Sequence, residues 1–143
     1  MENMADVVLA IDPGREKCGV AVVERGPDGG FRAVYRAAPD VESAPALIAE
    51  AARQYKPDVI LVGDGTNSAA FVRAVEGLGP ASVKVVDEKF TTLQARCRYF
   101  AENPPRGLRR LIPISLQTPP RPFDDYVAVI LAERFLAGTQ PEF

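Results

Sequence analysis

Residues 9–23 read LAIDPGREKCGVAVV, and this stretch decides how the rest of the chain is organised. Val7 to Ile11 is an unbroken apolar run, which is typical of a strand buried on both faces of a sheet. Asp12 ends the run, Pro13-Gly14 is a turn pair, and a second apolar strand returns from Gly19. The pattern therefore places one carboxylate at the end of a central strand.

This stretch alone leaves two interpretations of Asp12 open. Burying a negative charge costs free energy unless a positive group lies next to it, so a carboxylate here could bind a cation. Alternatively, its oxygens accept hydrogen bonds from the backbone amides of the turn, as turn aspartates commonly do. Because Asp-Pro-Gly turns are common, the stretch by itself favours the turn.

The composition is that of an ordinary globular protein. With 47% hydrophobic and 25% charged residues, the 143 residues predict one domain spanning 1–143. No apolar run approaches the roughly 20 residues of a membrane helix, and the N-terminus lacks a signal-peptide pattern. We therefore expect a cytoplasmic protein with no membrane partner. Cys18 and Cys97 form no C-x-x-C pair and are expected to be buried free thiols.

The chain contains no histidine, which excludes several mechanisms. A Ser-His-Asp or Cys-His nucleophile and a histidine-ligated zinc site are impossible. Acid–base chemistry must then come from carboxylates, Lys, Tyr, Cys or a metal-bound water. The composition directs any enzyme hypothesis towards carboxylates with a hard divalent cation.

The rest of the chain predicts an α/β fold with a five-stranded mixed sheet. Residues 31–38 read as a third antiparallel strand, and two apolar strands follow at 58–63 and 83–86. Helices are expected to start near Ser43, residue 69, Thr91 and Asp124, whereas the Pro- and Arg-rich residues 103–122 receive no firm structure. Right-handed crossovers give the strand order 3-2-1-4-5, with helices on both faces.

Acidic residues gather at one edge of this predicted sheet, where the carboxyl ends of its parallel strands converge. They are Asp12, Asp64, Asp87 and Glu88, and Asp124-Asp125 could join them if the last helix packs across the edge. Each acid alone is well explained by a turn or by a helix N-terminus. Together they favour a site for Mg²⁺ or Mn²⁺, because crowded carboxylates repel one another and these ions prefer oxygen ligands.

Three motifs carry a resemblance to a known family. They are Ile11-Asp12-Pro13-Gly14 with Gly19-Val20-Ala21, then Val86-Asp87-Glu88-Lys89-Phe90-Thr91-Thr92, then Phe123-Asp124-Asp125-Tyr126-Val127-Ala128 with Ile130-Leu131. Together they resemble YqgF (also called RuvX), a family of Holliday-junction-resolvase-like nucleases with a ribonuclease H-like fold. The second motif is the most specific, and the resemblance spans nearly the whole chain. The family's fold has the strand order deduced above.

The resemblance implies roles for the matching residues. The family's three catalytic, metal-binding acids fall on Asp12, Glu88 and Asp124, with Asp125 one position away as an additional candidate. Lys89 stands where the family usually has arginine, which keeps the cation but loses bidentate phosphate contact. After the fourth strand, Gly63-Asp64-Gly65-Thr66 replaces the usual Gly-Leu-Pro and is closer to the version in the Tex transcription accessory protein. Asp64 is thus either a fourth acid or a turn residue.

The reaction that the resemblance implies is metal-assisted hydrolysis of phosphodiester bonds. It would serve maturation of the 5′ end of pre-16S ribosomal RNA or, in an older proposal, resolution of junction DNA. Symmetric junctions would suit a homodimer. One alternative is a non-catalytic ribonuclease H-like module that binds RNA or a protein. Another is a sugar-kinase or actin-like ATPase, whose phosphate loop also begins Asp-x-Gly, but such enzymes need two lobes and 143 residues supply one.

A basic stretch supports a nucleic-acid partner, although the whole chain carries a net charge of −2. Residues 89–121 contain seven cations against one carboxylate, Glu102. A phosphate backbone bound beside an acidic edge needs such cations. The alternative is a solvated helix face and loop. Tyr99 and Phe100 could stack on unpaired bases but are expected in the helix's core. The cations predicted to contact nucleic acid are Lys89, Arg96, Arg106, Arg109, Arg110 and Arg121.

Replacing Arg106, Arg109 and Arg110 by glutamine should weaken nucleic-acid binding and flatten its salt dependence. Each lost phosphate contact removes about 0.7–0.9 from the slope of log K against log salt concentration. Fluorescence-anisotropy titrations of a labelled RNA at several salt concentrations measure both quantities. An unchanged slope would assign the three arginines to a solvated surface.

Overall fold

One mixed sheet organises the part of the chain that the computed structural model describes, which comprises residues 6–65, 67–78, 81–87, 91–104, 107–111 and 124–138. Within these ranges, six residues are described by their backbone alone: Thr92, Leu93, Arg96, Arg109, Arg110 and Asp124. The strands are β1 (Val7–Asp12), β2 (Gly19–Arg25), β3 (Phe31–Ala37), β4 (Val59–Gly63) and β5 (Ser82–Val86). Their order is β3-β2-β1-β4-β5, as predicted. β1 pairs antiparallel with β2 and parallel with β4.

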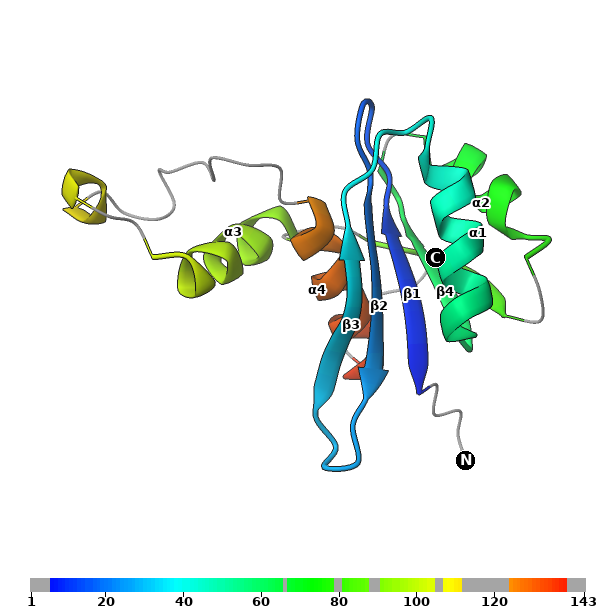
Figure 1. The fold of residues 1–143 in the computed structure, drawn as a ribbon, viewed down its shortest axis with the longest axis horizontal. Helices are drawn as coiled ribbons and strands as arrows, with labels where there is room; N and C mark the ends of the chain where they lie inside the picture. The colour runs from blue at the N-terminus through cyan, green and yellow to red at the C-terminus, as the bar shows by residue number, and fades with distance from the viewer. Residues whose placement is uncertain are drawn as a thin grey trace.

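Helices cover both faces of this sheet (Figure 1). They are α1 (Ala44–Tyr55), α2 (Ser68–Val75), α3 (Thr91–Glu102) and α4 (Asp124–Leu136), with a short 3₁₀ helix, η1 (Gly107–Leu111). α1 and α2 lie on one face, α4 lies on the other, and α3 packs on the outer side of α4. None of the helices in the described ranges is long and apolar enough to cross a membrane.

The central strand β1 is buried on both faces, as its apolar run predicts. Side chains alternate along a strand, so Val8 and Ala10 join the core under α4, whereas Leu9 and Ile11 join the core under α1 and α2. All four residues are fully buried. The continuous apolar run is therefore divided between two cores, one on each face.

The boundaries of α1 follow the local signals in the sequence. Pro45 lies in its first turn, where the missing N–H costs nothing, and Ile48 and Ala51 are buried one turn apart. Lys56 ends the helix in the left-handed conformation, and its N–H donates to the carbonyl of Ala52. Ser43 occupies the N-cap position without a side-chain capping bond.

Two expectations require correction. Cys18 is buried as predicted, but Cys97 is exposed, because it lies on a side of α3 that does not face α4. Residues 103–122 received no firm structure from the sequence, yet they contain η1, whose Leu108 and Leu111 are both exposed. Propensity and periodicity do not predict a five-residue 3₁₀ turn, since short helices of this kind depend on their surroundings.

Truncating Leu61 to alanine should lower the free energy of unfolding by about 2–5 kcal/mol, the usual cost of a large cavity in a core. Leu61 is fully buried in the centre of β4, in the core under α4. Urea denaturation followed by circular dichroism measures the change. The matched control is Leu108→Ala, because Leu108 is 82% exposed and should change stability by less than about 0.5 kcal/mol.

Candidate functional site

Asp12 is the last residue of β1 and is largely buried, with 9% of its surface exposed. Val8 and Ala10 face α4, so the two-residue period of the strand puts the Asp12 side chain on that same face. The carboxylate therefore lies at the carboxyl edge of the sheet, on the side that α4 covers.

Glycines stand beside Asp12 on both neighbouring strands. Gly19 of β2 pairs directly with Asp12. On the other side Ile11 pairs with Val62, and the register continued by one residue brings Gly63 of β4 next to Asp12. Neither position carries a side chain that could cover the carboxylate. A central acid flanked in this way can accept a ligand from the edge of the sheet.

Two arginines fix the direction in which α4 crosses the sheet. Arg25, at the end of β2 beside Asp6, donates from Nη2 to the carbonyl oxygen of Leu136 at 3.2 Å. The guanidinium carbon of Arg36 lies 4.7 Å from the centroid of the Tyr126 ring. Arg36 pairs with Ala21, which pairs with Ala10 of β1.

Along the direction of β1, the last residue of α4 thus lies beside the beginning of the strand. The first turn of α4 lies near the end of the strand. The helix rises about 15 Å from Tyr126 to Leu136, close to the roughly 13 Å that four strand residues span. α4 therefore runs antiparallel to β1, and its N-terminus reaches the Asp12 edge.

Asp125 lies in this first turn of α4 and is 6% exposed. It precedes Ala128 and Val129 by three and four residues, and both of these pack in the core against the sheet. Asp125 consequently belongs to the sheet-facing side of α4. Asp124 begins α4, but its side chain lies outside the description. The structure thus brings Asp12 and Asp125, both buried, to one edge and one face of the sheet.

Two further predicted acids, Asp64 and Asp87, follow β4 and β5 at the same edge. Asp64 is exposed, and its backbone N–H donates to the carbonyl of Val86 at 2.9 Å. Asp87 directly follows β5 and is half-buried. Glu88 and Lys89 lie outside the described residues. The backbone hydrogen bond of Asp64 is consistent with a turn residue. The position of Asp64 at the edge is consistent both with a turn residue and with a fourth acid of the site.

The turn after Asp12 is closed tightly and tied to its surroundings. A Cβ on Gly14 would lie 2.1 Å from the carbonyl oxygen of Lys17. Lys17 Nζ pairs with Asp40 Oδ1 at 2.9 Å. The side-chain amide of Asn67 donates to the carbonyl of Gly14 at 3.3 Å.

Asn67 joins the start of α2 to the turn that follows Asp12. It occupies the N-cap position in the left-handed conformation, with φ of 69°, and makes no side-chain capping bond. Asparagine tolerates this conformation better than most residues, which is the signal that was available in the sequence. Its side chain instead links the start of α2 to the turn that follows Asp12.

The donor set at this edge fits a hard divalent cation. Carboxylate oxygens are the ligands that Mg²⁺ and Mn²⁺ prefer, and two carboxylates buried close to one helix terminus gain from a positive charge nearby. Among the side chains that the structure describes, no three acids or thiols lie together in a metal-binding group. Neither Glu88 nor the Asp124 side chain is among those described.

The basic stretch divides into a described part and an undescribed part. The side chains of Arg96, Arg109 and Arg110, and the whole of Arg106 and Arg121, lie outside the description. Arg98 donates to both carboxylate oxygens of Glu133, at 2.7 and 3.1 Å, and these hydrogen bonds raise the pKa of Arg98. This arginine therefore serves the α3–α4 contact. Tyr99 and Phe100 are buried in that contact, which confirms the core interpretation for both.

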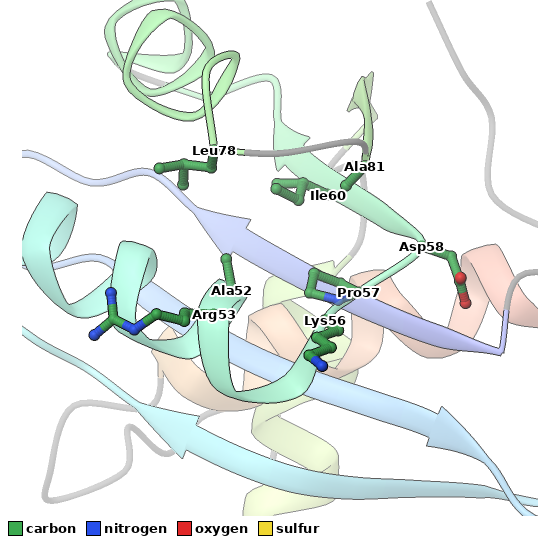
Figure 2. A pocket seen from close by; sticks show the side chains of 8 residues that line it. All are labelled: Ala52, Arg53, Lys56, Pro57, Asp58, Ile60, Leu78 and Ala81. Atoms are coloured by element: carbon green, nitrogen blue, oxygen red, sulfur yellow. The ribbon is translucent and has the colours of Figure 1, made fainter.

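A pocket of about 470 Å³ lies where α1 ends and β4 begins (Figure 2). Its walls come from the end of α1 and the start of β4, including Ala52, Pro57 and Ile60, with Arg53 at its rim. Val59 pairs with Val8 at the beginning of β1, whereas Asp12 ends that strand. The pocket and the acidic edge are thus separate features.

Comparison with known proteins identifies the fold. No protein-family model matches the chain, and no curated protein sequence matches it. Among solved structures, the chain is similar to T. thermophilus RuvC in complex with a Holliday junction substrate, at 20% identity and a TM-score of 0.57, over 96% of this chain and 99% of that one. It is similar to the fowlpox virus Holliday junction resolvase at 12% identity and a TM-score of 0.63, over 92% and 98% of the two chains.

A third similar structure is the yeast mitochondrial Holliday junction resolvase, at 11% identity and a TM-score of 0.51, over 90% of this chain and 77% of that one. These similarities extend over most of the chain at low identity, so they establish the fold. The five-stranded sheet and its helices have the ribonuclease H-like architecture of these resolvases, as the sequence predicted.

Replacing Gly14 by alanine should destabilise the protein by about 1–3 kcal/mol, the usual range for an added methyl group that has no space. The added Cβ would meet a backbone oxygen, which cannot move aside without opening the turn. Thermal denaturation measures the effect. Gly77→Ala is the matched control, because a Cβ there meets nothing within 4 Å. Equal stability of the two variants would contradict a closed turn.

Proposed function

We propose that this protein is a divalent-metal-dependent nuclease that hydrolyses phosphodiester bonds in structured nucleic acid. The observation that carries the proposal is the placement of two buried carboxylates, Asp12 and Asp125, at one edge and on one face of a ribonuclease H-like sheet. Acids of the first strand and the last helix are 112 residues or more apart in the chain, so their placement at the same edge is a property of the fold.

In this proposal Asp12, Glu88 and Asp124 hold one or two Mg²⁺ or Mn²⁺ ions. Asp125 is an additional ligand candidate, because its side chain lies on the sheet-facing side of α4. Such ions lower the pKa of an attacking water and stabilise the leaving oxygen of a phosphodiester. The glycines on the two strands beside Asp12 carry no side chain that would cover its carboxylate. Lys89, Arg96, Arg106, Arg109, Arg110 and Arg121 attract and orient the phosphate backbone.

The proposed substrate class is branched or folded nucleic acid. The resemblance of the three sequence motifs to YqgF favours the 5′ end of pre-16S ribosomal RNA, and the structural neighbours, which are Holliday junction resolvases, favour junction DNA. Residues 1–143 would act as one domain in the cytoplasm, and a homodimer would match the two-fold symmetry of a junction.

Asp12→Asn should reduce metal-dependent cleavage at least about 100-fold, because even outer-shell partners of metal ligands contribute 10–100-fold. A panel of pre-16S RNA fragments, single strands and four-way junctions, incubated with Mg²⁺ or Mn²⁺, measures the rate and identifies the substrate. Asp28→Asn is the matched control, since Asp28 is exposed in the β2–β3 turn at the other end of the sheet.

The same panel tests the non-catalytic alternative. If the wild-type protein binds these nucleic acids but leaves all of them intact with either ion, the chain is a binding module. If Asp12→Asn cleaves as fast as the wild type, another group performs the chemistry and the proposed site is wrong.

A further inference from the structure

Tyr126 is a buried tyrosine of α4 that contacts two other elements of the fold, α3 and β3. It directly follows Asp124 and Asp125 in the first turn of α4 and is 3% exposed. Its hydroxyl donates to Glu102 Oε1 at the end of α3, at 2.8 Å. The guanidinium of Arg36, from β3, covers the face of its ring. The ring also meets the Tyr99 ring edge-on, with centroids 5.6 Å apart.

Glu102 joins these contacts into one network. Its Oε1 lies 3.9 Å from Arg36 Nη1, and its Oε2 lies 3.5 Å from Arg98 Nε. Arg98 in turn donates two hydrogen bonds to Glu133, which lies two turns after Tyr126 in α4. Half-exposed ion pairs of this kind add little stability individually. Their common effect is geometric, because α4 is held against α3 and β3 at defined points.

The network contacts the first turn of α4, which carries the two acids Asp124 and Asp125. Arg25 holds the last residue of α4, and Arg36 holds Tyr126 near the first, so the helix can neither slide nor rotate freely over the sheet. One residue of slippage changes the level of a side chain by about 1.5 Å and its direction by about 100°. Productive sites tolerate only about 0.5 Å and 10–20°.

We propose that Tyr126, Arg36 and Glu102 are positioning residues that set the acids of α4 against Asp12. None of the three touches substrate or metal in this inference, which rests on the proposed function of the acidic edge. The hydrogen bond of the Tyr126 hydroxyl can be abolished by a substitution that removes only that one oxygen atom. The ring contact to Arg36 is a second, separable part.

Removing the hydroxyl by Tyr126→Phe should weaken Mn²⁺ binding about 10-fold, the low end of the range for direct partners of metal ligands, because the hydroxyl acts through the position of α4 and bonds no proposed ligand. The Mn²⁺ affinity is measured by electron paramagnetic resonance without nucleic acid, at a temperature where both proteins are folded. The Mn²⁺ concentration for half-maximal cleavage should rise by the same factor, with cleavage at saturating Mn²⁺ largely restored. Loss of folding alone would lower the maximal rate without such a shift.

Two further variants separate positioning from general destabilisation. Glu102→Gln retains an acceptor for the Tyr126 hydroxyl and should keep the Mn²⁺ affinity within about 3-fold, whereas Glu102→Ala should match Tyr126→Phe. Tyr55→Phe is the matched control, because Tyr55 pairs with Tyr35 on the opposite face of the sheet.

The outcomes distinguish this inference from the function on which it rests. If the wild type binds Mn²⁺ and Tyr126→Phe binds it equally well, the positioning role is overturned while the metal site stands. If the wild type neither binds Mn²⁺ nor cleaves any substrate of the panel, the proposed function and the positioning role both fail.

Discussion

Burial of β1 on both of its faces is the constraint on which the rest of the structure depends. Val8 to Ile11 are fully buried, and both edges of the strand are hydrogen-bonded, so polar groups can be accommodated only at its ends. The chain must then supply helices to both faces of the sheet. Asp12 is the first position along the strand where a carboxylate can stand, and it stands there beside two glycines.

The packing of α4 brings a second acid to the edge of the sheet where Asp12 lies. Ala128 and Ala132 are fully buried against the sheet, where small side chains let the helix approach closely. Arg25 and Arg36 of the β2–β3 hairpin contact opposite ends of the helix and so set its direction. An acid near the end of the chain is thereby brought to an acid near its beginning. Buried carboxylates cost stability unless a hydrogen bond or a positive charge meets them.

The fold is shared with resolvases at 11–20% identity, which shows how little of it depends on particular side chains. Strand burial, crossover handedness and helix amphipathicity suffice to specify the sheet and its covering layers. Function depends on sites that are built on such a fold, and in the function proposed above those are the acids of the edge and the residues that orient them. In that proposal the Tyr126 network belongs to the orienting residues, since side chains of β3 and α3 contact α4 through it.

The sequence by itself determined the strands, their order, the helix boundaries within a few residues and the place of Asp12, because periodicity and turn chemistry are local and crossovers are right-handed. Tertiary structure decided the remaining features. Asp125 is buried on the sheet side of α4, Asn67 bridges to the Gly14 turn instead of capping α2, and Arg98 binds Glu133. Each of these depends on which side chains meet across 35 residues or more of chain, and no local pattern contains that information.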